Sequence, residues 1–365
     1  MKKAKTIIAG ICRTLLGLVF LFSGAVKAID PLGTVYKIED YLKAFGGIFT
    51  DLLPMAEVAA WSLIILELLL GVCMVFNIRT QCTSWISLLF YCVMTPLTLY
   101  IALTNPVSDC GCFGDAIVLT NWQTFFKNVV LILLAIVLVL LRKSTRPLWS
   151  NWMEIAIIAV AIIAAVLFMQ WTYNHLPIKD FRPYKIGNNI PQLMEWPEDA
   201  EADQYEVKLV YAKDGIEQAF TLQDYPKSDS TWTFVRQESK LIKKGYEPPI
   251  HDFEIIDAEG YDITWDILEN PDPVTLIVMY DLAKADKQQL NKVEELYTSL
   301  SPNCYILTGS GTDEIIAFSL GYPTLNDGIC TCDPVTLKTI VRANPGAIVL
   351  QNGTVIDKYN LRNRP

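Results

Sequence analysis

Histidine is scarce in this chain of 365 residues, which contains only His175 and His251. A metal site built from several histidines is therefore nearly excluded. Basic residues are also in short supply, with 30 Lys and Arg against 39 Asp and Glu and a net charge of −9. The deficit lies in residues 175–365, which have 18 basic and 30 acidic residues. Because binding nucleic-acid phosphates needs a basic surface, we expect no nucleic-acid partner.

Long apolar runs dominate the first half of the chain. A helix that crosses a bilayer needs about 20 mostly apolar residues. Five segments meet this requirement, and they predict five membrane-spanning helices in contact with the lipid bilayer: Thr6–Ala28, Ala56–Phe76, Cys82–Leu103, Trp122–Leu141 and Trp152–Tyr173. The first is too long and continuous for a signal peptide, so we expect it to be retained.

The basic residues beside these segments predict their direction. If the N-terminus is cytoplasmic, seven of them fall on the cytoplasmic side: Lys2, Lys3, Lys5, Arg79, Arg142, Lys143 and Arg146. The positive-inside rule favours this orientation. Five spans then place residues 175–365 outside the cytoplasm. Between the first two spans, apolar residues at helical spacing over 31–54 predict an amphipathic helix at the outer end of the bundle.

Four ionisable residues lie in or at the ends of the first two spans. Charges in lipid are costly, so each should face the bundle and find a partner. The antiparallel arrangement suggests that Arg13 pairs with Glu67, and that Lys27 pairs with Glu57 at the outer end. Such pairs either only fix the helix packing or form a polar cavity for a quinone head group or a proton path.

The loop between the third and fourth spans carries two cysteines separated by one residue, Cys110-Gly111-Cys112. Glycine permits the tight backbone that a disulfide between them would need. Such a ring is strained, and strained disulfides are the ones that exchange readily. The loop lies on the expected outer side, which is oxidising. It is therefore either a redox-active pair or an inert staple.

Several short sequences of the first half resemble the DoxX/MauE redox-associated membrane proteins over residues 5–142. They are Arg13-Thr-Leu-Leu-Gly17, Ser23-Gly-Ala-Val-Lys27, Glu67-Leu-Leu-Leu-Gly71 and Cys110-Gly-Cys-Phe-Gly114, with Trp122 opening the next span. The resemblance implies a four-helix bundle in a bacterial cytoplasmic (inner) membrane. It also implies a role in disulfide formation or maturation of exported proteins, with Cys110 and Cys112 as the redox pair.

The second half opens with a linker and a small β-rich segment, in which Asp214-Gly215 is a hairpin signature. From residue 249 the expected order is a hairpin, a buried strand at 274–280, a helix, a strand at 304–308, two further helices and a final hairpin. This order resembles an extracytoplasmic thioredoxin-like domain. Pro248–Asp262 is similar to the opening hairpin of that family, and Asn344-Pro345-Gly346-Ala347 to its cis-proline loop.

That family carries Cys-x-x-Cys after the first core strand, where this chain has Asp281–Gln289 and no cysteine. Ordinary thioredoxin activity is therefore not expected. A second Cys-x-Cys, Cys330-Thr331-Cys332, comes just before a predicted helix, whose N-terminus would lower a thiol pKa. These cysteines are either a relocated redox pair or a structural feature.

The predicted architecture is a membrane α-helical bundle of four helices (1–145), a fifth transmembrane helix (146–174), a linker with a small β-rich insert (175–247) and a soluble α/β thioredoxin-like domain (248–365). The preferred function is that of a membrane thiol–disulfide redox protein, with a quinone as a candidate cofactor. The alternative is a non-catalytic, membrane-anchored assembly factor whose thioredoxin-like domain binds exported partners.

Overall fold

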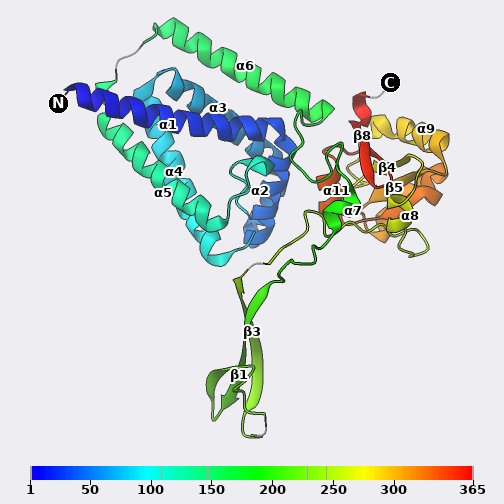
Figure 1. Cartoon of the computed structure of the whole chain (residues 1–365). Helices are drawn as coiled ribbons and strands as arrows, with labels where there is room; N and C mark the ends of the chain where they lie inside the picture. The colour runs from blue at the N-terminus through cyan, green and yellow to red at the C-terminus, as the bar shows by residue number, and fades with distance from the viewer. Residues whose placement is uncertain (1, 108, 146–147, 228, 244, 364–365) are drawn as a thin grey trace.

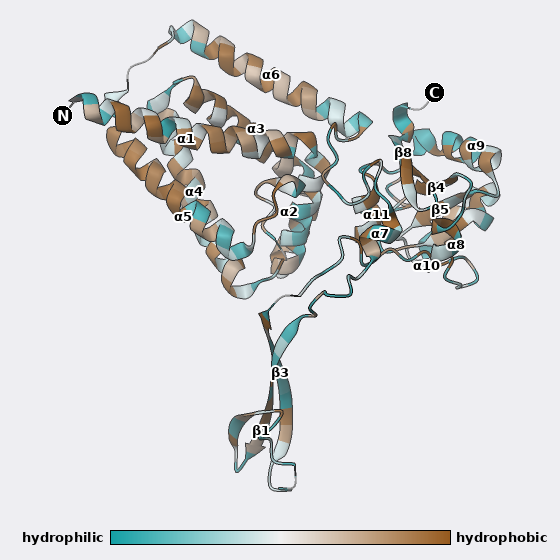
Figure 2. Ribbon diagram, viewed as in Figure 1, coloured by the Kyte–Doolittle hydropathy of each residue, from teal (hydrophilic) through white to brown (hydrophobic). Residues whose placement is uncertain are grey.

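The computed structural model describes residues 2–107, 109–145, 148–227, 229–243 and 245–363 (Figure 1). Arg146, one of the residues used above to predict orientation, lies outside these ranges. Five helices in the first half are long and apolar enough to cross a membrane: α1 (Lys2–Ile29), α3 (Ala56–Val75), α4 (Thr80–Thr104), α5 (Asn121–Leu141) and α6 (Asn151–His175). The prediction of five apolar spanning helices is therefore confirmed. Figure 2 shows hydrophobic residues along almost their whole length.

Helices α1 and α3 pack at a very short distance because a glycine of each helix lies against the backbone of the other helix. A Cβ atom on Gly71 would lie 2.7 Å from the backbone nitrogen of Leu21, and one on Gly24 would lie 2.9 Å from that of Leu68. Small residues commonly permit such contacts between membrane helices. Helix α5 packs beside α4 and α1, and α6 lies along the outside of the bundle against α3 (Figure 1).

The segment between α1 and α3 begins as an α-helix, α2 (Pro31–Phe45), with Asp30 as its N-cap. Gly46 and Gly47 then take positive φ angles of 64° and 57°. An α-helix cannot continue through that conformation, so the chain proceeds as a 3-10 helix, η1 (Gly47–Met55). The single amphipathic helix predicted over 31–54 is therefore wrong beyond Phe45. We call the end of the bundle that carries α2 and the loop 105–120 the docking end.

After α6 the chain enters a linker containing α7 (Ile190–Met194) and then a three-stranded antiparallel sheet that projects away from the rest (Figure 1). We call this sheet the arm. Its order is β2-β1-β3, formed by β1 (Gln204–Lys213), β2 (Ile216–Thr221) and β3 (Thr233–Lys243). Asp214 and Gly215 have positive φ angles of 51° and 80°, as a two-residue hairpin turn requires. Of the arm's described side chains, only Val210 is buried.

The last part of the chain is built on a five-stranded sheet of order β6-β5-β4-β7-β8. Strands β4, β5 and β6 run parallel, and β7 and β8 are antiparallel to their neighbours. The strands are β4 (Val274–Val278), β5 (Cys304–Thr308), β6 (Ile329–Thr331), β7 (Gly346–Gln351) and β8 (Thr354–Asn360). The predicted opening hairpin is reduced to a single bridge between Ile256 and Asp262, because α8 begins at Thr264 and draws the chain away.

Alternating residues of β4 supply two hydrophobic cores, one on each face of this sheet. Leu276 and Val278 pack with α8 (Thr264–Leu268) and α11 (Pro334–Ile340). Ile277 packs on the other face, with α9 (Leu290–Leu300) and α10 (Thr312–Gly321). The remaining 3-10 turns are η2 (Gly114–Ala116), η3 (Arg142–Ser144), η4 (Lys287–Gln289), η5 (Pro323–Gly328) and η6 (Leu361–Asn363).

Candidate functional site

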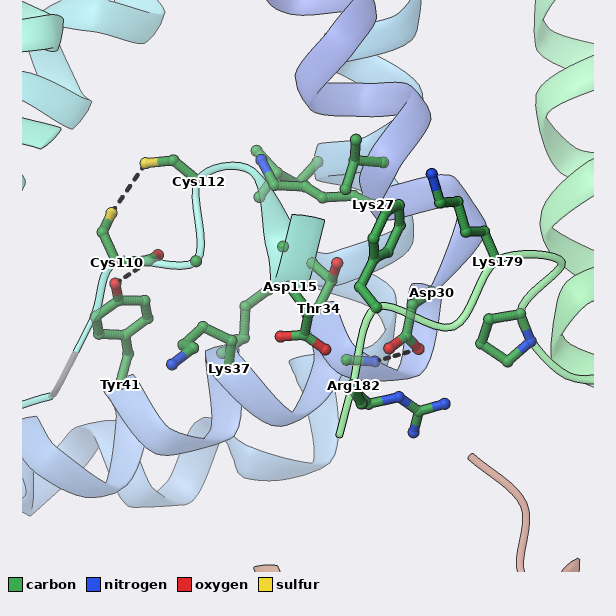
Figure 3. Close-up of a pocket in the computed structure, with 18 of the residues that line it drawn as sticks. Lys27, Asp30, Thr34, Lys37, Tyr41, Cys110, Cys112, Asp115, Lys179 and Arg182 are labelled. Carbon is green, nitrogen blue, oxygen red and sulfur yellow. Dashed lines mark hydrogen bonds between the residues drawn. The ribbon is translucent and has the colours of Figure 1, made fainter. Parts of the chain in front are cut away.

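The two cysteines of the loop between α4 and α5 lie side by side, with 3.0 Å between Cys110 Sγ and Cys112 Sγ (Figure 3). The loop can turn this tightly because Gly111 has a φ of 63° and Gly114 one of 52°. The backbone nitrogen of Gly114 donates to the carbonyl of Gly111 at 3.0 Å, and that of Gly111 donates to the Asp109 carboxylate at 2.8 Å. The pair is therefore held in a closed turn.

Helix α2 fixes the Cys110 side of the loop. The Tyr41 hydroxyl donates to the carbonyl oxygen of Cys110 at 2.8 Å, and Lys37 Nζ pairs with the Asp109 carboxylate at 3.0 Å. Figure 3 shows Tyr41 reaching from α2 to Cys110, with Lys37 beside it on the same helix. The amphipathic segment that the sequence predicts as a helix at the end of the bundle thus also carries contacts to the cysteine pair.

Helices α1 and α3 fix the Cys112 side through a buried polar cluster. Lys27 Nζ lies 2.7 and 2.9 Å from the two carboxylate oxygens of Glu67. The Ser23 hydroxyl lies 2.8 Å from Glu67 Oε2 and 2.7 Å from the carbonyl oxygen of Cys112. It can donate to one of them at a time, and it accepts a hydrogen bond from Lys27 at 3.0 Å. Ser23 therefore connects the backbone of Cys112 to the buried Lys27–Glu67 ion pair.

This ion pair differs from the pairs expected from the sequence. The contacts of Gly24 with Leu68 and of Gly71 with Leu21 set the register of α1 against α3. In that register Lys27 is level with the turn that carries Glu67. Arg13 lies 14 residues, or ~21 Å, from Lys27 along α1, so the Arg13–Glu67 pair is wrong.

The Lys27–Glu57 pair is also wrong, because Glu57 is exposed in the first turn of α3. A carboxylate there is favoured by the helix dipole. The Nε and Nη1 atoms of Arg13 are buried without a hydrogen-bond partner among the described residues.

Two cavities meet at the cysteine pair. The larger, of about 190 Å³, is lined by both cysteines, by apolar residues of the bundle such as Met94 and Leu97, and by the linker residues Phe181 and Arg182 (Figure 3). The smaller, of about 40 Å³, lies inside the bundle and is lined by Cys112 but not by Cys110. Cys112 therefore lines both the outer cavity at the docking end and a smaller pocket inside the helices, which contains Ser23, Lys27 and Glu67 and which we call the polar pocket.

The polar pocket also contains Lys127 of α5, whose Nζ lies 4.3 Å from the centre of the Phe113 ring. A hydrogen bond from the Cys110 thiol lowers the pKa of Cys112, and Lys127 and Lys27 lower it further against the effect of burial. The same thiol–thiol hydrogen bond, together with burial, raises the pKa of Cys110. The two cysteines are thus chemically unequal.

Arg342, which follows α11, connects the C-terminal sheet to the loop. Its Nε lies 2.8 Å from Asp30 Oδ2, and its Nη2 lies 3.3 Å from Asp115 Oδ2, three residues beyond Cys112. Burial opposes the charge of Asp30, but Arg342 holds the pKa of that carboxyl below its usual value. The hydroxyls of Tyr36 and Tyr280 are 2.9 Å apart in the same interface.

The second Cys-x-Cys is in the core of the C-terminal sheet. Cys330 and Cys332 are 3% and 8% exposed and pack in the same hydrophobic cluster as Leu337 and Ile255. Burial raises the pKa of both thiols to about 12. The N-terminus of α11 next to Cys332 therefore does not offset the effect of burial on the pKa of that thiol.

The Asn344–Pro345 peptide bond is cis, and Pro345 lines a cavity of about 420 Å³ together with Tyr280 and Asp286. Cys332 lines a different cavity, with His251 and Asp333. The structure therefore does not bring the second cysteine pair together with Pro345.

Residues 5–141 match the family model of methylamine utilisation protein MauE. Residues 205–244, which include the arm, match the model of a domain of unknown function, DUF8463. No curated protein and no solved structure matches the chain. The MauE match covers α1, α3, α4, α5 and the Cys-Gly-Cys loop, and it indicates a membrane protein associated with redox or electron-transfer chemistry.

Within the MauE-matched region, sequence reasoning missed three residues that touch or face the cysteine pair. Ser23 was noted only as part of a motif, and Tyr41 and Lys127 were not singled out. Ser23 lies four residues before Lys27, so the two share one helix face, and this spacing could have been used. Lys127 is a single charge six residues into an apolar span, and the cost of such a charge was the available signal.

Proposed function

We propose that this protein is a membrane thiol–disulfide redox protein in which Cys110 and Cys112 exchange with disulfides of exported proteins and so support their formation or maturation. The observation that supports the proposal best is the glycine turn that holds the two sulfur atoms 3.0 Å apart. The unequal pKa values of the two thiols add to it, because exchange needs one thiolate and one thiol.

In the exchange, a thiolate of the pair attacks one sulfur of the partner disulfide and forms a mixed disulfide, releasing the other partner sulfur as a thiolate. The second cysteine then attacks the mixed disulfide, so that a Cys110–Cys112 disulfide forms and the partner leaves with two reduced sulfurs. Two electrons pass from the pair to the partner, and the proton of the second cysteine is taken up by a released thiolate. The reverse sequence oxidises a partner dithiol.

A quinone from the bilayer is the proposed second redox partner of the cysteine pair. The cavity of about 190 Å³ supports this, because Val26, Leu63 and Leu97 give it apolar walls while Tyr41 and Lys27 place polar groups at the cysteines. When bound, a quinone would accept two electrons and two protons from the dithiol. Oxidation of the reduced, purified protein by a soluble quinone analogue should require both Cys110 and Cys112.

For residues 248–365 we propose a thioredoxin-like domain without thioredoxin activity. The sheet order and the absence of cysteine from Asp281–Gln289 support this proposal. The alternative function, a non-catalytic assembly factor, draws on the same observations, since such a domain could only bind partners. The proposed units are residues 1–145, 146–174, 175–247 and 248–365.

The proposed location is a bacterial cytoplasmic membrane, with the N-terminus in the cytoplasm and the docking end outside. The basic residues of the short loops support it, because Arg79, Arg142 and Lys143 lie at the end of the bundle opposite the cysteine loop. Alkaline phosphatase fused after Tyr359 should be active, and a fusion after Lys143 should be inactive. The opposite result would move the cysteine pair into the cytoplasm.

Covalent trapping tests the function directly. Cys110→Ala and Cys112→Ala variants of the full chain are expressed in the native host, the thiols are blocked with acid and alkylating agent, and mixed disulfides are resolved by non-reducing electrophoresis and mass spectrometry. We expect a reductant-sensitive partner on at least one variant. A Cys330→Ala/Cys332→Ala double variant is the matched control and should form no such adduct. If no single variant traps a partner, the assembly-factor alternative is favoured.

A further inference from the structure

The surroundings of Cys110 differ from those of Cys112, and the difference comes from the helices around the loop rather than from the loop itself. Cys110 faces α2 through the Tyr41 contact, whereas Cys112 alone lines the pocket between α1, α3, α4 and α5. Within that pocket Lys27 and Lys127 provide two positive charges and Glu67 one negative charge. The pocket therefore has a positive balance next to one sulfur only.

Glu67 and Ser23 hold the nearer of these cations in place. Glu67 binds Lys27 through both carboxylate oxygens, and Ser23 joins that ion pair to the Cys112 backbone. All three side chains are buried. Lys127 comes from another helix and forms no ion pair with a carboxylate of the described residues, but its ammonium lies over the ring of Phe113, the residue after Cys112. Two helices thus bring positive charge into the pocket that Cys112 lines.

We propose that Cys112 is the attacking thiolate of the pair, that Lys127 and Lys27 hold it ionised, and that Glu67 and Ser23 act as positioning residues that fix Lys27 beneath it. This inference rests on the proposed thiol–disulfide exchange and assigns its first step. Cys112 attacks the partner disulfide, and Cys110, which keeps its proton until then, closes the ring and releases the partner.

The pH dependence of Cys112 depends on every charged or titratable group around it. From the helices and the loop these are Lys27, Lys37, Tyr41, Glu67, Tyr91, Asp109, Cys110 and Lys127. From the start of α2, η2 and the linker, Asp30, Asp115, Lys179 and Arg182 line the outer cavity. Lys37 is paired with Asp109, and Arg182 with Asp180. The two lysines of the inner pocket are therefore the cations whose removal should change Cys112 most.

The test measures the ionisation of each thiol in the reduced full-length protein in detergent. In a Cys110→Ser background, Cys112 is alkylated with iodoacetamide at a series of pH values, and the peptide that contains it is quantified by mass spectrometry. A Cys112→Ser background gives the same measurement for Cys110. We expect the midpoint for Cys112 below the ordinary thiol value of about 8.5. At pH 6 we expect Cys110 to react at least about tenfold more slowly, since one pKa unit changes the thiolate fraction tenfold.

Charge variants with opposite expected signs separate this role from a structural one. Lys127→Met should slow the alkylation of Cys112 at pH 6 by about tenfold, and Lys27→Met should do the same or more, because Glu67 is then left uncompensated. Lys27→Arg should restore the rate. Glu67→Gln should accelerate the reaction, because it removes a negative charge and keeps Lys27. A variant that only disturbed the packing would not accelerate the alkylation of Cys112. Opposite effects of the lysine variants and of Glu67→Gln therefore indicate an electrostatic role.

Two further variants protect the test against misfolding and unspecific charge effects. If Lys27→Met does not fold, Lys127→Met, which breaks no ion pair between described residues, decides alone. Lys43→Met removes an exposed charge from α2 and should leave the profile of Cys112 unchanged. The proposal is overturned if Cys110 reacts faster than Cys112, if Lys127→Met leaves the profile unchanged, or if Lys43→Met shifts it equally.

These results are independent of the trapping experiment. A lysine-dependent Cys112 thiolate without any trapped partner would leave this inference standing and remove the proposed function. If a partner is trapped but the ionisation of Cys112 does not depend on Lys127, the proposed function stands and this inference is overturned.

Discussion

The two Cys-x-Cys sequences of this chain have the same spacing and lie in opposite surroundings. Cys110 and Cys112 flank a glycine with positive φ, so the chain turns and the two sulfur atoms meet. Cys330 and Cys332 flank a threonine at the end of strand β6, where side chains alternate. Both cysteines therefore enter the core, and Thr331 stays exposed. The residue between the cysteines and its backbone conformation, rather than the spacing, decide whether the two sulfur atoms lie side by side.

The largest expected difference between the two pairs is in their reactivity towards alkylating agents. In the folded, reduced protein at pH 7, Cys112 should be labelled within minutes, whereas Cys330 and Cys332 should be labelled only after unfolding. A pKa of about 12 leaves only about one such thiol in 10⁵ ionised at that pH, and burial blocks access as well. Differential isotope-coded alkylation measures all sites at once. Equal labelling rates in the folded protein would remove the distinction.

The second prediction concerns Arg342, which contacts Asp30 and Asp115 near the first cysteine pair and none of the residues around the second pair that are named above. Arg342→Met leaves the largely buried Asp30 carboxylate without its cation, and removing one partner of a buried ion pair costs about 3–5 kcal/mol. We expect faster proteolysis in the linker and altered alkylation of Cys112, with Cys330 still protected. Lys284→Met is the matched control, because its pair with Asp281 is largely exposed and should contribute at most about 1 kcal/mol. Equal effects of the two variants would contradict the buried role of Arg342.

The third prediction compares serine substitutions in the two pairs. Cys330→Ser places a hydroxyl in the hydrophobic core, which should cost about 1–3 kcal/mol of unfolding free energy. Cys110→Ser lies in a half-buried polar loop and should cost about 0.5 kcal/mol or less. Thermal unfolding followed by fluorescence in detergent measures the difference. A larger loss from Cys110→Ser would mean that the first pair, not the second, is structural.

The smallest expected effect comes from the middle residues. Gly111→Ala forces a side chain into a positive φ and places its Cβ 2.8 Å from Lys37 Cγ, which should cost about 1 kcal/mol. Thr331→Ala changes an exposed side chain on an extended strand and should stay within about 0.5 kcal/mol. The rate at which an added oxidant closes the Cys110–Cys112 disulfide gives the more sensitive measurement. It should fall in Gly111→Ala and remain unchanged in Thr331→Ala.

Much of this architecture follows from sequence patterns that act locally. Uninterrupted apolar runs predict the five spanning helices because the lipid imposes one length on all of them. Strand alternation and the Asp214-Gly215 turn predict most of the sheets in the same way. The Arg13–Glu67 pairing failed because an antiparallel arrangement alone does not fix the depth of α1 relative to α3. The register of α1 against α3 is set instead by contacts of Gly24 and Gly71, which sequence spacing does not reveal.

The candidate site was predicted only in its loop. The spacing of Cys110 and Cys112 is visible in the sequence, but the groups that make them unequal come from four different helices. Lys127 is 15 residues away and Lys27 is 85 residues away from Cys112 in the chain. Their convergence depends on tertiary packing, which no local pattern encodes. For the same reason the sequence could not show that Cys330 and Cys332 are buried, since their burial requires α11 to cover β6.

The base of the arm has a consequence for how this chain could be altered. The backbone nitrogen of Tyr246 donates to the carbonyl of Glu201 at 2.9 Å, and that of Gly245 donates to the Asp203 carboxylate at 2.7 Å. The two ends of the arm therefore meet where it leaves the linker. A short bridge between Asp203 and Gly245 would excise the arm as a cassette without stretching the chain, and another hairpin could be inserted at the same junction. Because its two ends meet, the contribution of the arm can be assayed by deletion of this cassette alone.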